Sequence, residues 1–379
     1  MRGEREKQTE LFIYRTPNSY VADEHPLRKV KELVDPILAS LSPLFDKMYT
    51  KRGRRSIPPE RLLKALLLQA LYTVRSERQL CEQIEYNILF RWFLDMEMNE
   101  KAFDPTVFTK NRDRLLDREV GRRFFDAVVD VAYDSGWASE EHFTVDGTLI
   151  EAWASMKSFR PIDDSSQEDN PTDNENDKGQ GNGNRQSGDD PGNPSVDFHG
   201  EKRTNSTHRS TTDPEARLAK KGKGKEAKLA FMGNALMENR NGLLVDFDLR
   251  QCSGTAERDG AIDMLDRAAE RDFEPSSLGA DKGYCALDFI DKLEVRGIQP
   301  HVAAREKSTV PRKEVTDSPG YAISQKKRKL IEEIFGWFKT IGGMRKTRFI
   351  GVKRVGLQAL LAGAAYNLLR IANLESSCG

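Results

Sequence analysis

Three acidic residues occupy positions where a carboxylate could do chemistry. Asp146 interrupts an apolar, strand-like run in FTVDGT, Asp281 directly follows a short strand-like run in LGADKGY, and Glu332 lies in the helical segment RKLIEEIFGWFK. A charge within an apolar strand is costly unless it is paired or bound to a metal ion. Two strand-borne aspartates and a helix-borne glutamate supply the hard oxygen ligands that a pair of Mg²⁺ ions needs, and they leave positions open for a substrate phosphate.

The helix expected around Glu332 also places cations beside that carboxylate. Arg328, Glu332 and Lys339 follow one another at helical spacing and share one face, whereas Glu333 points about 100° away. Flanking cations suit a phosphodiester backbone rather than the metal ions. The alternative is that Asp281 is an ordinary turn former and Glu332 an exposed helix residue paired with Arg328.

Local charge indicates a polyanionic partner although the whole chain is neutral. The 379 residues include 60 Lys+Arg and 60 Asp+Glu, which excludes a uniformly basic nucleic-acid coat but not a basic face. Residues 201–230 hold nine basic against four acidic residues, and residues 301–360 hold fourteen against five. We expect DNA contacts from cations in these blocks, with a solvated face as the alternative. The candidates are Lys221, Lys223, Lys225, Arg328, Lys339, Arg345, Lys346 and Arg348.

Other chemistries find no support in the sequence. The four cysteines lie far apart without a CxxC pair, which argues against a disulfide scaffold and a zinc ribbon. The chain has no GxSxG elbow and no GxxxxGK[ST] loop, so neither serine nucleophilic catalysis nor a nucleotide cofactor is expected. The polar N-terminus predicts no signal peptide, and the longest apolar tract, 357–369, is interpreted as too short and too polar to cross a bilayer. We therefore expect a soluble cytoplasmic protein.

The first part of the chain is predicted to be helical. Residues 1–56 form an arm with one helix, and residues 57–136 form a compact all-α domain. Pro59 suits the first turn of a helix, and Ser76 is placed to cap the next one. The helices are expected over 29–49, 61–74, 76–94, 106–116 and 117–134.

Residues 137–379 are predicted to form one α/β domain with an insertion. Strand-like and helical segments alternate as strand, hairpin, helix, strand, helix, strand, helix, which is typical of a mixed sheet covered by helices. Asn241-Gly242 marks the turn of the hairpin. Residues 161–200 hold ten acidic against two basic residues and almost no aliphatic ones, so we expect a disordered loop there.

Three motifs resemble those of the DDE transposases of bacterial insertion sequences, in the group of families four and five. TVDGTLIEAWASMKSF resembles the segment with the first catalytic aspartate, ADKGY resembles the segment with the second, and Arg328, Glu332 and Lys339 match the spacing of the arginine–glutamate–lysine signature. A tyrosine normally stands three residues before that arginine, and here the position holds Gln325. Residues 199–229 and the helical region over 46–120 are similar to the family-five branch.

The resemblance implies a ribonuclease-H-like catalytic domain in which Asp146, Asp281 and Glu332 bind Mg²⁺, with Mn²⁺ as a substitute. It implies hydrolysis and then strand transfer by in-line attack, on terminal inverted repeats and target DNA. The helical domain would help to grip the element ends, and paired ends favour a homodimer. A catalytically inactive, transposase-derived DNA-binding protein and another ribonuclease-H-like nuclease remain alternatives. No role is assigned to His208, while Trp337 is interpreted as a core residue, with stacking on a flipped base as the alternative.

Overall fold

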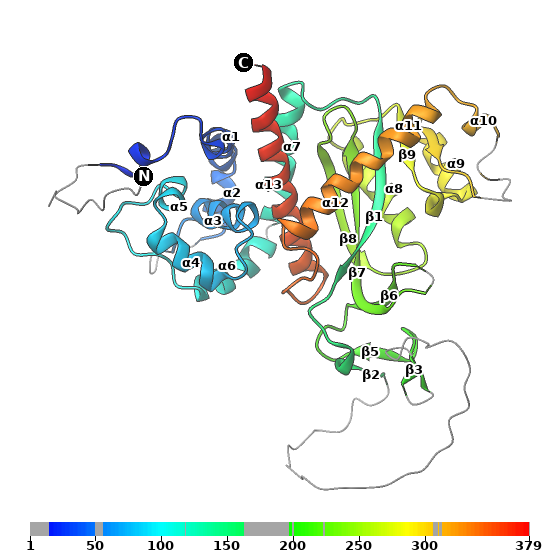
Figure 1. Cartoon of the computed structure of the whole chain (residues 1–379), viewed down its shortest axis with the longest axis horizontal. Helices are drawn as coiled ribbons and strands as arrows, with labels where there is room; N and C mark the ends of the chain where they lie inside the picture. Colours follow the sequence, from blue (N-terminus) through cyan, green and yellow to red (C-terminus); the bar gives the residue numbers. More distant parts are fainter. Residues whose placement is uncertain are drawn as a thin grey trace, which may run out of the picture.

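The computed structural model shows a helical part and a sheet-containing part side by side (Figure 1). It describes residues 15–49, 56–117, 119–162, 197–198, 201–222, 224–305, 310 and 313–378. Most of the expected acidic loop therefore lies outside the described residues, as does Lys223.

Most of the expected helices of the first part are confirmed, but the single helix expected over 29–49 is two, Pro26–Ser40 and Ser42–Asp46, which meet at Leu41. Ser76 Oγ accepts a hydrogen bond of 3.2 Å from the Gln79 backbone N–H and so caps its helix. The segment expected as one helix over 76–94 is two, because the Asn87 side chain caps a new helix by accepting from the Leu89 backbone N–H at 3.0 Å. The helices are α1 (Pro26–Ser40), α2 (Ser42–Asp46), α3 (Pro59–Leu71), α4 (Glu77–Tyr86), α5 (Ile88–Phe93), α6 (Thr106–Asp117) and α7 (Val120–Asp134), after the 3₁₀ turn η1 (Pro17–Tyr20).

The predicted mixed sheet is also confirmed. Its strands are β1 (Phe143–Glu151), β6 (Arg217–Lys220), β7 (Ala227–Glu238), β8 (Leu244–Gln251), β9 (Ser277–Ala280) and β10 (Gln299–Val302). They run in the order β10-β9-β1-β7-β6, and β8 also pairs with β7. The pairs β10–β9 and β9–β1 are parallel and the others antiparallel. Two short pairs lie outside this sheet, formed by β2 (Phe159–Pro161) with β5 (His208–Ser210) and by β3 (Asp197–Phe198) with β4 (Glu201–Lys202).

The β7–β8 hairpin closes as the Asn241-Gly242 signal predicts. Gly242 has φ +68°, which a residue with a side chain rarely adopts. The buried carboxylate of Glu238 accepts hydrogen bonds from the backbone N–H groups of Arg240 at 2.5 Å and Asn241 at 2.9 Å. The Glu238 carboxylate therefore stabilises the turn through hydrogen bonds with backbone N–H groups of the same hairpin.

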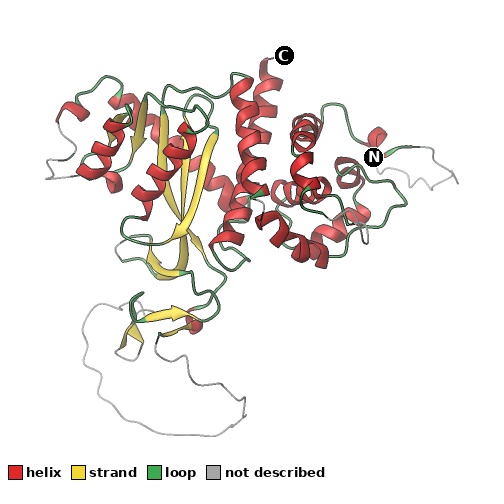
Figure 2. Cartoon of the chain, turned by 180° about the vertical axis from the view of Figure 1, so that it is seen from behind, coloured by secondary structure: helices red, strands yellow, loops and turns green. Residues whose placement is uncertain are grey.

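Helices cover both faces of the sheet (Figure 2). They are α8 (Ala256–Ala269), α9 (Leu287–Val295), α10 (Lys313–Thr316), α11 (Tyr321–Lys327), α12 (Ile331–Thr340) and α13 (Val352–Cys378). The helix expected to carry both Arg328 and Glu332 is interrupted, because the 3₁₀ turn η4 (Arg328–Leu330) separates α11 from α12. Helix α12 crosses the sheet in front of β1 (Figure 1). Two shorter 3₁₀ turns are η2 (Met156–Ser158) and η3 (Lys282–Tyr284).

Helix α13 lies between the two parts of the molecule (Figure 1). The side chain of buried Asn367 accepts from the Leu244 backbone N–H at 2.9 Å and donates to its carbonyl at 2.7 Å, which fixes α13 to β8. Contrary to the expectation from its sequence, this segment is long and apolar enough to cross a membrane, by length and composition alone. Since 72% of its apolar window is buried within the protein, the same property describes a core helix.

One buried ion-pair cluster joins α7, β8 and α8. Asp246 is 3% exposed and accepts from Arg122 at 2.5 Å and from Arg267 at 2.8 Å. Asp246→Ala would leave two guanidinium groups without their shared carboxylate, so we expect a loss of about 3–5 kcal/mol in the free energy of unfolding. Urea unfolding measures this loss. Asp266→Ala, which removes a half-exposed partner of Arg296, should cost no more than about 1 kcal/mol, and an equal effect of both variants would contradict the prediction.

Candidate active site

Asp146 and Asp281 lie at the same level of two neighbouring parallel strands. Strand β1 pairs with β9 through Thr144 opposite Gly279, and each aspartate follows its strand's paired residue by two positions. The Asp281 carboxylate accepts a hydrogen bond from the Gly283 backbone N–H at 2.5 Å, at the start of η3. The fold thus brings together two carboxylates that are far apart in the sequence.

The surroundings of Asp146 disfavour its negative charge. The pKa of Asp146 is raised to about 6, chiefly by burial and also by the charges of Asp281 and Glu257, against the opposing effects of the Gly147 backbone N–H and of Arg328. The Gly147 N–H donates to the carboxylate at 2.8 Å. A nearby cation would stabilise the ionised form of this carboxyl group, as a bound metal ion does.

This pKa shift predicts that Asp146 lowers the stability of the metal-free protein. Because the folded-state pKa is above the unfolded value, the folded state binds more protons between about pH 4 and 6, and stability is lost as the pH rises through that window. In EDTA at pH 7.5, Asp146→Asn should therefore be about 2 kcal/mol more stable than wild type, with the difference shrinking towards pH 4. Urea unfolding across this pH range measures it, and a variant less stable than wild type at pH 7.5 would contradict it.

Two cations, Arg328 in η4 and Lys339 near the end of α12, lie near Asp146 and its strand. The charge of Arg328 lowers the pKa of Asp146, and Lys339 Nζ donates a hydrogen bond to Thr148 on β1. Glu332 lies between these two cations on the helix and is exposed. Its neighbour Glu333 instead forms an ion pair with Arg370 of α13 at 3.6 Å. Glu332 and Glu333 therefore differ in their surroundings, while the single helix face expected for Arg328, Glu332 and Lys339 is interrupted by η4.

The acidic residues do not yet form a closed cage. Within the described part of the chain, no group of three or more Asp, Glu, His or Cys side chains is arranged to hold a metal ion. The two aspartates are near enough for their charges to interact, and Glu332 lies on the helix that crosses their strand. The structure thus leaves the metal role of Glu332 as a prediction.

A fourth acidic residue, Glu257, lies beside the aspartates and was not predicted from the sequence. It is the second residue of α8, and burial followed by the charge of Asp281 raises its pKa. An acidic residue in the first turn of a helix is ordinary, because it interacts favourably with the helix dipole. The sequence around Glu257 therefore carries no signal that separates it from a helix-stabilising residue.

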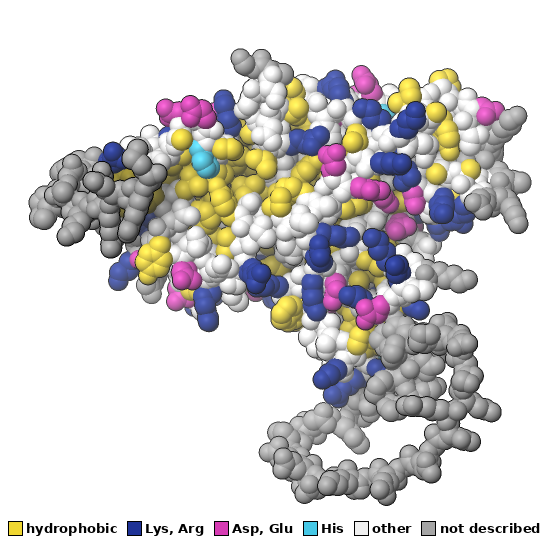
Figure 3. All heavy atoms as spheres, viewed as in Figure 1, with side chains coloured by type: hydrophobic (Ala, Val, Ile, Leu, Met, Phe, Trp, Pro, Cys, Tyr) yellow, Lys and Arg dark blue, Asp and Glu magenta, His cyan; other side chains and the backbone are white. Residues whose placement is uncertain are grey.

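The two basic blocks converge beside the acidic residues. Burial lowers the pKa of Lys339, and the positive charges of Lys221 and Arg345 lower it further, so these three cations are neighbours. Glu151, at the end of β1, forms ion pairs with Lys346 at 3.3 Å and with Lys228 at 3.2 Å. Acidic side chains gather on the face where α12 crosses the sheet, with Lys and Arg side chains around them (Figure 3).

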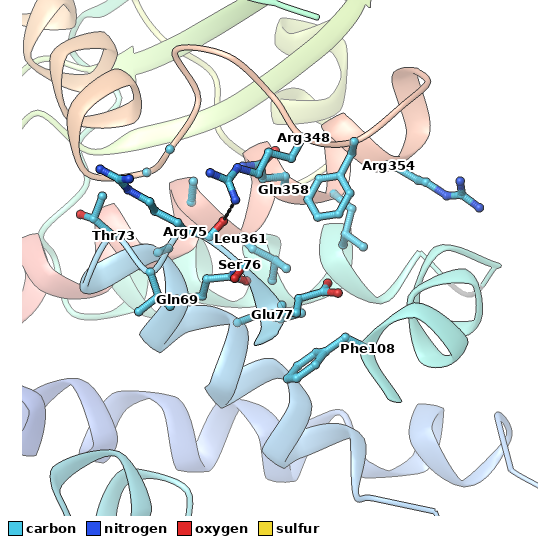
Figure 4. A pocket seen from close by; sticks show the side chains of 18 of the residues that line it. Gln69, Thr73, Arg75, Ser76, Glu77, Phe108, Arg348, Arg354, Gln358 and Leu361 are labelled. Atoms are coloured by element: carbon cyan, nitrogen blue, oxygen red, sulfur yellow. Dashed lines mark hydrogen bonds between the residues drawn. The ribbon is translucent and has the colours of Figure 1, made fainter. Parts of the chain in front are cut away.

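A cavity of about 790 Å³ separates the helical part from the segment after α12. Its walls include Leu66, Phe108 and Leu361, and Arg75 and Arg348 lie along it (Figure 4). The Arg348 guanidinium donates to the Arg75 backbone carbonyl and so connects the two parts. Further cations that line this interdomain cavity are Arg112, Lys339, Arg345, Lys346 and Arg354.

Three other residues singled out from the sequence, Trp337, His208 and Lys225, lie in different surroundings. Trp337 packs edge-on against Tyr366 of α13 at 5.7 Å, in agreement with the core interpretation. His208 is buried and stacks on Phe159 with ring centroids 5.4 Å apart. Lys225 is exposed after β6, and no described ion pair involves it.

Comparison with known proteins identifies two domains. The family "Transposase domain (DUF772)" matches residues 16–114, and the family "Transposase DDE domain" matches residues 203–368. The second range contains Asp281 and Glu332, whereas Asp146 lies between the two ranges. No curated protein sequence matches the chain.

Solved structures similar to this chain include two transposase complexes. One is a piggyBac transposase synaptic complex with hairpin DNA, at 10% identity and a TM-score of 0.43, covering 93% of this chain and 76% of that one. The other is the Mos1 strand transfer complex, at 12% identity and a TM-score of 0.25, covering 85% and 79%. The two matched families together span well over half of the sequence, and the chain belongs to the DDE transposases, enzymes that act on DNA.

Proposed function

We propose that this transposase cuts the ends of its insertion sequence and joins them to target DNA at the site formed by Asp146, Asp281 and Glu332. The observation that carries the proposal is the pair of aspartates at one level of two parallel strands, with the charges of Arg328 and Lys339 acting on Asp146. The mixed sheet with helices on both faces supports a ribonuclease-H-like domain. The motifs and the segment over 199–229 support the family-five branch.

The donor set fits a divalent cation. Asp146 and Glu257 have raised pKa values in the metal-free protein, so a positive ion in their midst would relieve the repulsion between carboxylates. Mg²⁺ keeps several waters and takes one or two carboxylates plus substrate phosphate, so it does not require a preformed cage. We infer that Asp146, Asp281 and Glu332 hold Mg²⁺, or Mn²⁺ in its place. When bound, the metal activates the attacking oxygen and stabilises the leaving one.

The chain's own residues orient the DNA. Arg328 and Lys339 flank Glu332 in the sequence and lie near Asp146, which supports a role in binding DNA phosphates. Lys221 and Arg345 extend this positive surface, and the interdomain cavity continues it towards the helical part. We propose that the element end lies along this surface, that two copies of the chain act on paired ends, and that no nucleotide cofactor takes part.

Single cations of this surface should account for part of the salt dependence of DNA binding. Lys221→Ala and Arg345→Ala should each reduce the slope of log K against log salt by about 1, because each removes one phosphate contact and its released counterion. A filter-binding or fluorescence titration at several salt concentrations measures the slope. Lys292→Ala, an exposed lysine on α9 paired with Asp288, is the matched control and should leave the slope unchanged. Equal slopes in all three variants would contradict this DNA path.

The proposed function is tested with purified protein and a labelled duplex that carries the element's own terminal repeat. Nicking at the repeat in Mg²⁺ or Mn²⁺ but not in EDTA, followed by joining of the 3′ end to a second duplex, is the expected result. Binding without cleavage in either metal would favour the inactive, transposase-derived DNA-binding protein. Cleavage without regard to the repeat would favour another ribonuclease-H-like nuclease.

A further inference from the structure

The Glu257 side chain lies beside the two aspartates, in space that is open because Gly147 and Gly283 have no side chains. A Cβ atom at Gly147 would lie 2.9 Å from both Cγ and Oε1 of Glu257. A Cβ atom at Gly283 would lie 2.8 Å from Asp281 Oδ1 and 3.4 Å from Glu257 Oε2. The Glu257 carboxylate therefore occupies the space that these two glycines leave open, one directly after Asp146 and the other bonded to Asp281.

Two buried oxygen atoms at this place point to a missing species. Tyr284 is fully buried, its hydroxyl has no hydrogen-bond partner in the described part of the chain, and the negative charges of Asp146, Glu257 and Asp281 all act on it. Asn234 lies opposite Gly147 across β7 and β1 and is also fully buried. Its Oδ1 has no partner among the described residues and lies 3.2 Å from the position of a Gly147 Cβ.

We propose that Glu257 is an additional metal ligand of this active site, on the side of the aspartates that faces α8. The proposal rests on the proposed function, since it takes the ion at Asp146 and Asp281 as given. Carboxylate oxygens are the ligands that Mg²⁺ and Mn²⁺ prefer, and the orphaned Tyr284 hydroxyl and Asn234 carbonyl are placed to bond to waters that the ion retains.

This assignment gives Glu257 a different position from Glu332. Glu257 reaches the aspartates from α8, through the space that Gly147 and Gly283 leave, whereas Glu332 lies on α12 between two cations. Glu257 would hold an ion in the DNA-free protein. Glu332 would complete the site when phosphate neutralises Arg328 and Lys339.

The test is a titration of the full-length, DNA-free protein with Mn²⁺, in which electron paramagnetic resonance measures the Mn²⁺ that remains free. Glu257→Gln should weaken Mn²⁺ binding at least about 10-fold, as loss of a carboxylate near a metal does. Glu257→Asp keeps the charge but shortens the reach, so it should fall between Gln and wild type. Asp259→Asn, an exposed acid in the same first turn of α8, should bind Mn²⁺ as wild type does.

The outcomes separate this proposal from the one on which it rests. Wild-type affinity in Glu257→Gln together with lost affinity in Asp146→Asn would overturn the role of Glu257 and leave the proposed function standing. Wild-type protein that binds no Mn²⁺ and cuts no DNA would overturn both. Misfolding is not expected in Glu257→Gln, because the raised pKa shows that the fold disfavours this charge, and circular dichroism checks it.

Discussion

Asp146→Asn and Asp281→Asn are each expected to abolish strand cleavage and joining while DNA binding is retained. Asparagine has nearly the shape of aspartate but lacks the negative charge that a hard cation prefers. The stabilisation of transition-state charge by a metal is worth several kcal/mol, so its loss should lower the rate by about 10³-fold or more. The measurement is the single-turnover rate of nicking on a labelled element end in Mg²⁺.

Measurements of DNA binding and of stability show whether the loss of activity comes from the missing carboxylate or from damage to the fold. The DNA affinity of both variants should stay at or above that of wild type, since each loses a negative charge beside a basic surface. Asp291→Asn, an exposed residue of α9, is the matched control and should cut at the wild-type rate. An Asp146→Asn protein that still joined DNA strands would refute the assignment. Loss of activity without loss of stability would distinguish a functional carboxylate from a structural one such as Asp246.

Local sequence signals predicted most elements of this fold. The Pro59 start, the Ser76 cap and the Asn241-Gly242 turn are each encoded within a few residues, and the structure confirms all three. Three interruptions of predicted helices depended on details that periodicity does not resolve. The helix expected over 29–49 divides at Leu41 into α1 and α2. Asn87 divides one apolar helical run into α4 and α5, and η4 interrupts the helix before Glu332.

Asp146 and Asp281, which the structure brings near each other, could be singled out from the sequence because each contrasts with its surroundings. Asp146 is a charge in an apolar strand, and Asp281 follows a short buried strand, so both positions are unusual for a solvated carboxylate. Glu257 could not be predicted in this way, since an acid at the start of a helix is common. Glu257 can lie beside the aspartates only because Gly147 and Gly283 have no side chains there. These glycines are distant from Glu257 in the sequence, so no local pattern shows the contact.

The adjacent residues Glu332 and Glu333 allow the sharpest test of α12. Glu332 is exposed in the first turn of α12, between Arg328 and Lys339 in the sequence, whereas Glu333 pairs with Arg370 of α13. Glu332→Gln should therefore lower the nicking and joining rates by about 10²-fold or more, because it removes a charged oxygen from the active site. Glu333→Gln removes the same charge from the next residue and should leave both rates within about threefold of wild type, since a half-exposed ion pair contributes at most about 1 kcal/mol.

Parallel assays of cleavage and Mn²⁺ binding show which carboxylate completes the site. If Glu332 acts only when DNA is bound, Glu332→Gln should cut poorly yet bind Mn²⁺ nearly as well as wild type without DNA. Glu257→Gln should lose affinity for Mn²⁺ in both conditions. Equal activity of Glu332→Gln and Glu333→Gln would remove Glu332 from the catalytic set. The helix face that carries Arg328 and Lys339 would then serve DNA positioning alone, with Glu257 as the third acidic residue of the site.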